Sequence, residues 1–148
     1  RFINLGFEMN IIECKSEQEI METYAVMSQL RPHVVKGDYL GLIREMEDQG
    51  GRLIAAMEGE KVVGCAFFRQ EVRLYTGPLF YVDDLVTDEN TRSKGVGHAL
   101  LDWVEKEAKA KGIKTIALDS GVHREQGHKF YFREGFTITS FNFKKTVE

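Results

Sequence analysis

Two basic residues and then two glycines follow a predicted strand and open a predicted helix, where they could bind a phosphate group. Glycine lets the backbone approach a ligand closely, and the first turn of a helix offers unpaired amides and the positive end of its dipole. The basic side chains add charge, although a tight turn with solvated basic residues would have the same composition. The segment consists of Arg92, Ser93, Lys94, Gly95, Val96 and Gly97.

Two familiar nucleotide-binding patterns are absent from the chain. A dinucleotide fingerprint needs a third glycine at the position that Leu100 occupies. No GxxxxGK[ST] string occurs anywhere. Neither pattern therefore supports binding of NAD or ATP.

Cysteine and histidine form no metal or redox pattern in the sequence. Cys14 and Cys65 have neither CxxC spacing nor a companion histidine pattern, which predicts two reduced, buried thiols. No histidine is placed near Cys65 by sequence, so a cysteine nucleophile is not expected. The histidines share no ligand spacing on a predicted helix, so no metal site is expected. They are His33, His98, His123 and His128.

Length and composition predict one globular domain. The chain has 148 residues, of which 43% are apolar and 29% charged. No stretch approaches the roughly 20 apolar residues of a membrane span, and residues 1–10 lack a signal-peptide pattern, so we expect a cytoplasmic protein without a membrane partner. A net charge of −3 does not suit a general nucleic-acid binder. Residues 9–148 are interpreted as the domain, with Met9 as its natural start and 1–8 as a leader of natural or added origin.

The first half of the chain predicts a strand, two helices and a hairpin. Residues 10–14 are β-like, and Ser16 with Glu19 forms a capping box that opens a helix ending at Arg31, before Pro32. A second helix is predicted from Asp38 to the glycines at 50–51. Strands at 52–57 and 61–68 flank the sequence Glu-Gly-Glu, which predicts a hairpin turn.

The second half predicts a βαβ unit followed by a helix and a strand. A strand at 79–87, a helix at 95–111 and a strand at 113–118 form this unit, and its two strands should be parallel. A helix at 123–134 and a closing strand at 136–145 follow. The predicted fold class is α/β (α+β), a mixed, mostly antiparallel twisted sheet with helices on both faces.

Three motifs in the right order make the chain similar to the GNAT superfamily of acyl-CoA-dependent N-acetyltransferases, over nearly its whole length from Met9. The segment Arg92-x-x-Gly95-x-Gly97 matches that family's R/Q-x-x-G-x-G/A pattern. The residues from Phe130 to Phe136 resemble its F-Y-x-x-x-G-F segment, and those from Asp83 to Thr87 resemble its acidic, apolar fourth strand. The resemblance implies a GNAT-like fold and acetyl-CoA as cosubstrate.

The resemblance also assigns residues to the cofactor. It implies that the backbone amides of Leu85, Val86 and Thr87 face the pantetheine arm where the fourth and fifth strands splay apart. Arg124 and Gly127 depart from the family, whose members often carry Asn and Ala there, so the cofactor contacts of that helix are weaker expectations. The pyrophosphate would be held by Arg92, Ser93, Lys94, Gly95, Val96, Gly97 and His98.

Three groups are assigned to the chemistry by the same resemblance. Asp83 would accept the amine proton, through water, while Asp84 points to the opposite face of its strand. Tyr131 would protonate the departing sulfur, because a phenol with a pKa of about 10 is protonated at neutral pH. The amide of Val86 would stabilise the oxyanion. Without the motif, the aspartates could form ion pairs and Tyr131 could be a core aromatic.

The resulting hypothesis is an N-acetyltransferase that transfers acetyl directly to an amine in a ternary complex. The segments at 31–38 and 69–78 would shape the acceptor site, and neither carries a recognisable specificity code. A small amine is preferred to a protein amine, and a homodimer is left open. The alternatives are a CoA-binding module without turnover, a structural domain, and an acyltransferase for protein amines, hydroxyls or longer acyl chains.

Overall fold

The computed structural model describes residues 9–91 and 95–148. The predicted leader at 1–8, and Arg92, Ser93 and Lys94 of the predicted phosphate segment, lie outside the described residues. Contacts divide the chain into two compact units, Arg1–Ala117 and Leu118–Glu148, which are described separately. Among the described residues, no helix is both long and apolar enough to cross a bilayer.

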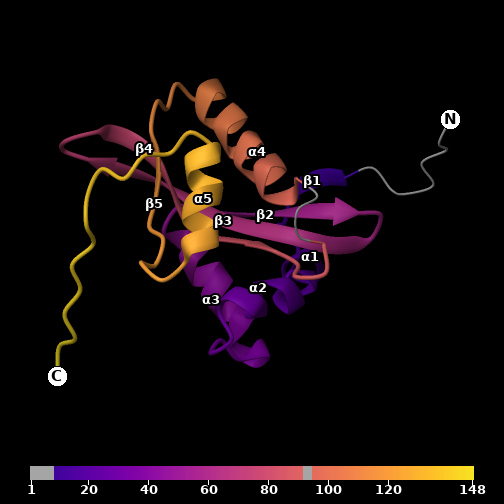
Figure 1. Cartoon of the computed structure of the whole chain (residues 1–148). Helices are drawn as coiled ribbons and strands as arrows, with labels where there is room; N and C mark the ends of the chain where they lie inside the picture. Colours follow the sequence, from indigo (N-terminus) through magenta and orange to yellow (C-terminus); the bar gives the residue numbers. More distant parts are fainter. Residues whose placement is uncertain (1–8, 92–94) are drawn as a thin grey trace, which may run out of the picture. The chain divides into compact units, whose positions relative to one another are not determined.

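A five-stranded sheet with the order β1-β2-β3-β4-β5 organises the first unit (Figure 1). The three pairings from β1 to β4 are antiparallel. The hairpin turn between the long third and fourth strands spans only 74–76, so most of segment 69–78, which was expected to shape the acceptor site, is strand. The strands are β1 (Met9–Glu13), β2 (Gly51–Glu58), β3 (Lys61–Arg73), β4 (Gly77–Thr87) and β5 (Ile116–Leu118).

The predicted first helix is two helices in the structure, α1 (Glu17–Glu22) and α2 (Tyr24–Leu30). The predicted capping box of Ser16 and Glu19 is present at the start of α1. The break falls at Thr23, whose hydroxyl donates to the carbonyl of Ile20 at 2.6 Å and accepts from Tyr39 at 2.7 Å. The prediction of one continuous helix was wrong because this side chain, which is fully buried, replaces a helical bond with a tertiary contact.

Helices cover both faces of the sheet in the first unit. The third helix, α3 (Lys36–Asp48), joins α1 and α2 on one face, where Ile20 and Ile43 share a buried cluster with Phe67 of β3. The fourth, α4 (Val96–Ala110), lies on the other face, where Trp103 packs edge-on against Phe68. Figure 1 shows this division, which confirms the predicted class of mixed, mostly antiparallel sheet with helices on both faces.

Arg52 of β2 connects the sheet to α4. Its guanidinium lies 5.2 Å from the ring centre of Phe68 and 5.5 Å from that of Trp103. It also makes ion pairs of 2.8 Å with Glu13 and Glu107. The hydrogen bond from Arg52, opposed by partial burial, lowers the pKa of Glu13 below its ordinary value. This half-buried network holds α4 against the strands.

We expect Arg52→Met to lower the free energy of unfolding by about 2 kcal/mol, because two ring contacts are lost and two carboxylates lose their partner. Urea denaturation measures the change. The pKa of Glu13 is lower in the folded protein than in the unfolded chain. Glu13 therefore stabilises the fold at pH values above its ordinary pKa, and this stabilisation is lost as the pH falls through the pKa of the folded protein. The difference from wild type should therefore shrink in acid. Arg44→Met, which removes an exposed pair with Glu47, is the control and should change stability by less than about 0.5 kcal/mol.

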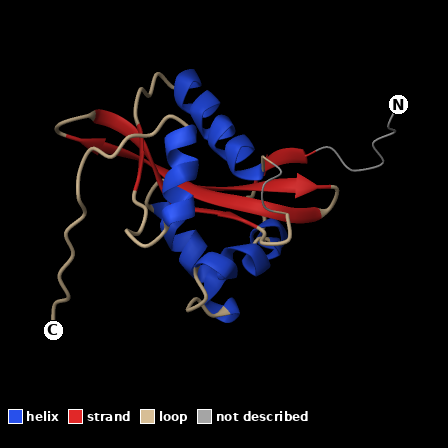
Figure 2. Ribbon diagram, in the orientation of Figure 1, coloured by secondary structure: helices blue, strands red, loops and turns tan. Residues whose placement is uncertain are grey.

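The second unit contains α5 (Glu125–Arg133) and a long extended segment after it. The closing strand predicted at 136–145 is wrong, since these residues form no strand (Figure 2). In the described part of the chain, residues 137–148 take part in no backbone–backbone hydrogen bond. Alternation of apolar and polar residues is therefore not sufficient here, because a strand also needs a neighbouring backbone to pair with.

Candidate active site

Strand β4 contains a β-bulge at the first of its two aspartates. Phe67 of β3 is opposite Asp84, and the next residue, Phe68, is opposite Val82, so Asp83 is the extra residue without a partner. A bulge of this kind bends its strand and changes the direction of nearby side chains. Such bulges are common beside active sites, and the pattern of alternation alone gave no sign of this one.

Because of the bulge, both aspartates bond to groups on one face of the sheet. Asp84 lies opposite Phe67, whose side chain belongs to the cluster with α1, α2 and α3. Asp83 bonds to Arg69, which is two residues from Phe67 in β3 and so lies on the same face. The expectation that Asp84 points away from Asp83 was wrong, since it assumed unbroken alternation.

Two arginines, which begin the segments 31–38 and 69–78 expected to shape the acceptor site but were not assigned a role of their own, hold this acidic pair. Arg69 Nε donates to Asp83 Oδ2 at 2.8 Å. Arg31, at the end of α2, donates to Asp84 Oδ1 at 2.8 Å and to the carbonyl oxygen of Asp83 at 3.1 Å. Burial raises the pKa of Asp83 above its ordinary value, and this effect exceeds the lowering by Arg69. The carboxyl group is thus a stronger base than an exposed aspartate.

Beyond the bulge, β4 has backbone groups that β5 does not cover. Phe80 N donates to Thr115 O at 3.0 Å, and β5 ends three residues after Thr115, so it does not extend along 85–87. Amides of an antiparallel strand point alternately to its two sides. Asp88 N donates to Val63 O, so the amide of Val86 also points toward β3. The amides of Leu85 and Thr87 point to the uncovered edge.

The N-terminal end of α4 packs closely on the sheet beside this edge. Gly95 is its N-cap, with a φ of 78° that favours glycine, and it supplies no capping side chain. The first turn of any α-helix leaves amides without carbonyl partners inside the helix. Val96 and Gly97 follow and are buried. Because Gly64 of β3 lies opposite Thr87, the helix end and the end of β4 are neighbours in the first unit.

Gly64 is the residue that permits this approach. A Cβ atom there would lie 2.5 Å from Val96 Cγ1 and 3.1 Å from the carbonyl oxygen of Val86. We expect Gly64→Ala to lower the free energy of unfolding by about 1–3 kcal/mol through overpacking, measured by chemical denaturation. Gly41→Ala is the matched control, since nothing lies within 4 Å of its Cβ position and alanine favours the exposed helix. Equal effects of the two substitutions would contradict the close packing.

The second unit carries Tyr131 on α5. Its ring packs edge-on against Phe130 at 5.3 Å and Phe136 at 5.7 Å between centroids. Burial raises its pKa, and the charge of Arg124 opposes this more weakly, so the phenol is protonated at neutral pH. Arg124 is the N-cap of the same helix. Among residues 9–91 and 95–148, none forms a hydrogen bond with the Tyr131 hydroxyl.

The thiols are placed as the sequence predicted. Cys14 and Cys65 are free and buried. Burial raises the pKa of Cys14 to about 12 and also raises that of Cys65, so neither thiol is an activated nucleophile. Within residues 9–91 and 95–148, no group of three or more His, Cys, Asp or Glu side chains could hold a metal ion.

Comparison with known proteins connects this arrangement to one family. The model of the acetyltransferase (GNAT) family matches residues 17–136. An uncharacterised N-acetyltransferase, YhdJ of Bacillus subtilis, is 33% identical over 134 residues, which are 89% of this chain and 94% of the relative. The aminoalkylphosphonate N-acetyltransferase of Salmonella typhimurium is 29% identical over 93 residues, 62% of this chain and 60% of the relative.

Solved structures show the same fold at lower identity. The aminoglycoside N-acetyltransferase AAC(6')-Iy in complex with CoA superimposes with a TM-score of 0.86 at 18% identity and covers 99% of both chains. A transcriptional regulator from Bacillus halodurans C-125 gives 0.83 at 22% identity over 95% of this chain and 100% of its own. These likenesses concern the fold alone.

Proposed function

Because the chain belongs to the acetyltransferase (GNAT) family, we propose that it transfers the acetyl group of acetyl-CoA directly to a small amine. The observation that carries this proposal is the arrangement along β4. The bulge at Asp83, the uncovered amides of Leu85 and Thr87, and the end of α4 follow one another within a few residues of one strand. An acceptor amine and a thioester could therefore meet beside it.

The residues present fit acetyl-CoA as a substrate. The first turn of α4, with no capping side chain from Gly95, suits the negatively charged pyrophosphate. The uncovered amides of β4 suit the amide groups of the pantetheine arm, which would extend the sheet. We retain Arg92, Ser93, Lys94, Val96, Gly97 and His98 as proposed pyrophosphate contacts, and Arg124 as a proposed contact from α5.

The proposed reaction uses one proton acceptor and one proton donor. The neutral amine attacks the acetyl carbonyl carbon, the C–N bond forms and the C–S bond of the thioester breaks. The proton of the nitrogen passes to Asp83 directly or through water, and Tyr131 gives its phenolic proton to the departing sulfur. The amide of Val86 was expected to stabilise the oxyanion, but this amide points toward β3. We therefore propose the amide of Leu85 or Thr87, which points to the uncovered edge, as the hydrogen-bond donor to the oxyanion.

The acceptor class is proposed from the charges around Asp83. The side chain of Arg31 is 39% exposed although it pairs with Asp84, so its guanidinium can also contact an anionic group. An amine whose nitrogen faces Asp83 could place such a group near Arg31. Aminoalkylphosphonates have this chemistry and appear in the name of one relative. We therefore propose them as the first acceptors to test, ahead of aminoglycosides, polyamines and protein amines.

Thermal denaturation in the presence of acetyl-CoA tests whether the chain binds this cosubstrate. A ligand at about 100 times its Kd stabilises a protein by about 2.7 kcal/mol, so a clear rise in Tm is expected. In Gly97→Leu, checked for folding by circular dichroism, this rise should be much smaller, because a bulky side chain obstructs the first turn of α4. No stabilisation of the wild-type protein by any acyl-CoA would contradict the proposal.

A panel of amines, with detection of the thiol released from acetyl-CoA, tests acetyl transfer and the choice of acceptor. Thiol release with aminoalkylphosphonates, at a rate above that with aminoglycosides or peptides, is expected. Stabilisation by acetyl-CoA without thiol release from any amine would favour a CoA-binding module. Faster release with a protein amine would overturn the preference for a small acceptor while leaving the transferase assignment intact.

A further inference from the structure

Gln29 of α2 makes two contacts with the turn that follows β4. Its Nε2 atom donates to Asp88 Oδ1 at 3.1 Å, and its Oε1 atom accepts from the amide of Glu89 at 3.0 Å. The side-chain amide therefore uses its donor and its acceptor at the same time, which only one orientation of the group allows. The contacts join residues 59 and 60 positions apart in the chain, and no role assigned above uses them.

Asp88 is the centre of this turn. It is 5% exposed, its amide donates to Val63 O at 2.8 Å, and its carbonyl oxygen accepts from the amide of Thr91 at 2.9 Å. A buried carboxylate needs hydrogen-bond donors. The hydrogen bond from Gln29, opposed by burial, lowers the pKa of Asp88 below its ordinary value. Gln29 thus fixes the residue on which the turn is built.

Helix α2 also holds β4 at a second point. Arg31 at the end of the helix bonds to the acidic pair that precedes residues 85–87, whereas Gln29 bonds to the turn that follows them. The stretch between the two contacts contains the amides of Leu85 and Thr87, which point to the uncovered edge. One helix therefore holds both ends of this stretch.

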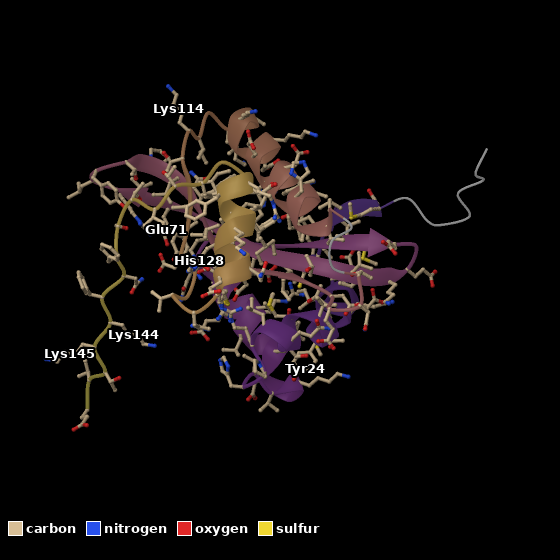
Figure 3. The ribbon with its side chains drawn as sticks, viewed as in Figure 1. Tyr24, Glu71, Lys114, His128, Lys144 and Lys145 are labelled. Atoms are coloured by element: carbon tan, nitrogen blue, oxygen red, sulfur yellow. The ribbon has the colours of Figure 1, made fainter. Side chains whose placement is uncertain are left out.

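The position of α2 is itself well fixed. Tyr24, its first residue and one of those labelled in Figure 3, donates to Val34 O at 2.7 Å. The Tyr24 ring packs edge-on against Tyr39 of α3, with 5.2 Å between the ring centroids. Val26 of the helix belongs to the same buried cluster as Val86 of β4. These contacts make α2 a firm support for the strand.

Such support matters at 85–87 because the sheet holds this stretch from one side. Within the described residues it pairs with β3, and β5 does not extend along it. The amides of Leu85 and Thr87 must meet the thioester with hydrogen-bond geometry to act as proposed. A misplacement of about 1 Å can lower a rate by on the order of 100-fold.

We propose that Gln29 is a positioning residue for acetyl transfer, which holds the end of β4 so that the uncovered amides face the thioester of acetyl-CoA. This inference rests on the proposed function, because it concerns the same amides. Gln29 acts through Asp88 and Glu89 and not through a contact with the substrates. Its own side chain is exposed, so the fold should tolerate its replacement.

Amide hydrogen exchange without any substrate tests the contact itself. Gln29→Met keeps the length of the side chain and removes both hydrogen bonds, so the amide of Glu89 should exchange at least about 10-fold faster, measured by NMR. Gln18→Met is the matched control, since it removes a similar bond to the carboxylate of Glu22 on the exposed surface of α1. Equal exchange of the Glu89 amide in the wild type and in both variants would overturn the proposal.

Steady-state kinetics with the best acceptor of the amine panel tests the role in transfer. Gln29→Met should lower kcat/KM for acetyl-CoA by about 10- to 100-fold. The KM of the amine should change by less than about twofold, because the pair of Arg31 and Asp84 is intact. Gln18→Met should keep both values. A purely structural role would lower Tm and affect the two substrates alike, and this result would overturn the proposal.

Reversal of the donor and the acceptor provides a rescue. Gln29→Glu alone brings two carboxylates together and should lose as much activity as Gln29→Met. In Gln29→Glu/Asp88→Asn the new amide donates to the new carboxylate, which still accepts from the amide of Glu89. The double variant should recover most of the wild-type kcat/KM for acetyl-CoA. Absence of any recovery in a folded double variant would contradict the positioning role.

These outcomes separate the positioning role from the proposed function. If acetyl-CoA does not stabilise the wild-type protein, or no amine releases thiol, the proposed function is wrong and the role of Gln29 in transfer falls with it. If the wild-type protein transfers acetyl and Gln29→Met has an equal kcat/KM for acetyl-CoA, the positioning role alone is wrong.

Discussion

Tyr131→Phe is expected to lower kcat by about 100- to 10,000-fold, the range typical of a lost general acid. The substitution removes one oxygen and keeps the ring contacts with Phe130 and Phe136, so stability should change little. Burial raises the pKa of Tyr131, which keeps the phenol protonated and able to donate at neutral pH. The Kd of acetyl-CoA should be nearly unchanged.

Single-turnover kinetics is the measurement of choice for Tyr131→Phe, because slow product release could hide a change in the chemical step. Lys109→Gln serves as the control, since Lys109 is an exposed residue in the last turn of α4 that pairs with Glu105 on the helix surface, and its variant should keep the wild-type rate. Wild-type single-turnover rates in Tyr131→Phe would remove this residue from the mechanism. Transfer would then depend on proximity and on the amides of β4.

Asp83→Asn should lower the transfer rate most at low pH, where the acceptor amine is largely protonated and a base is needed to remove its proton. A loss of about 100-fold or more is expected there, and it should decrease as the pH rises toward the pKa of the amine. The full pH profile of kcat/KM, measured with one good acceptor, records this difference. Asp84→Asn should lose less, because its carboxylate serves the pair with Arg31.

Stability measurements separate the catalytic from the structural role of Asp83. The pKa of Asp83 is higher in the folded protein than in the unfolded chain. Its contribution to stability is therefore largest at pH values below its ordinary pKa, and it decreases as the pH rises through the pKa of the folded protein. Loss of the charge in Asp83→Asn should therefore lower Tm only slightly at neutral pH, despite the lost ion pair with Arg69. If Asp83→Asn and Asp84→Asn lowered the transfer rate equally, or in proportion to their loss of Tm, the two carboxylates would have a structural and not a catalytic role.

Local signals in the sequence predicted most helices and strands because their causes are local. The capping box of Ser16 and Glu19 started a helix within one residue of its predicted position. Gly59, with a φ of 62°, made the predicted turn of the first hairpin. The spacing of Gly95 and Gly97 after a strand placed the start of α4. Each of these features depends on a few neighbouring residues.

Features that depend on distant residues could not be predicted in this way. The helix break at Thr23 requires Tyr39, which is 16 residues away in the chain. The pairing of Asp83 with Arg69 requires β3 to lie beside β4 with one extra residue in the ladder. No local pattern marks either partner, and the bulge exists only where two strands meet.

The sequence by itself determined the family, the class of fold and the residues proposed for the chemistry, because the motifs around Asp83, Gly95 and Tyr131 are contiguous stretches of chain. Only the tertiary structure decided how they are used. The bulge turned both aspartates to one face, and ladder alternation directed the amides of Leu85 and Thr87 to the uncovered edge. Residues 137–148 form no strand within the described part of the chain. Hydrogen bonding between strands is a relation between distant segments, so it is settled by folding and not by composition or local order.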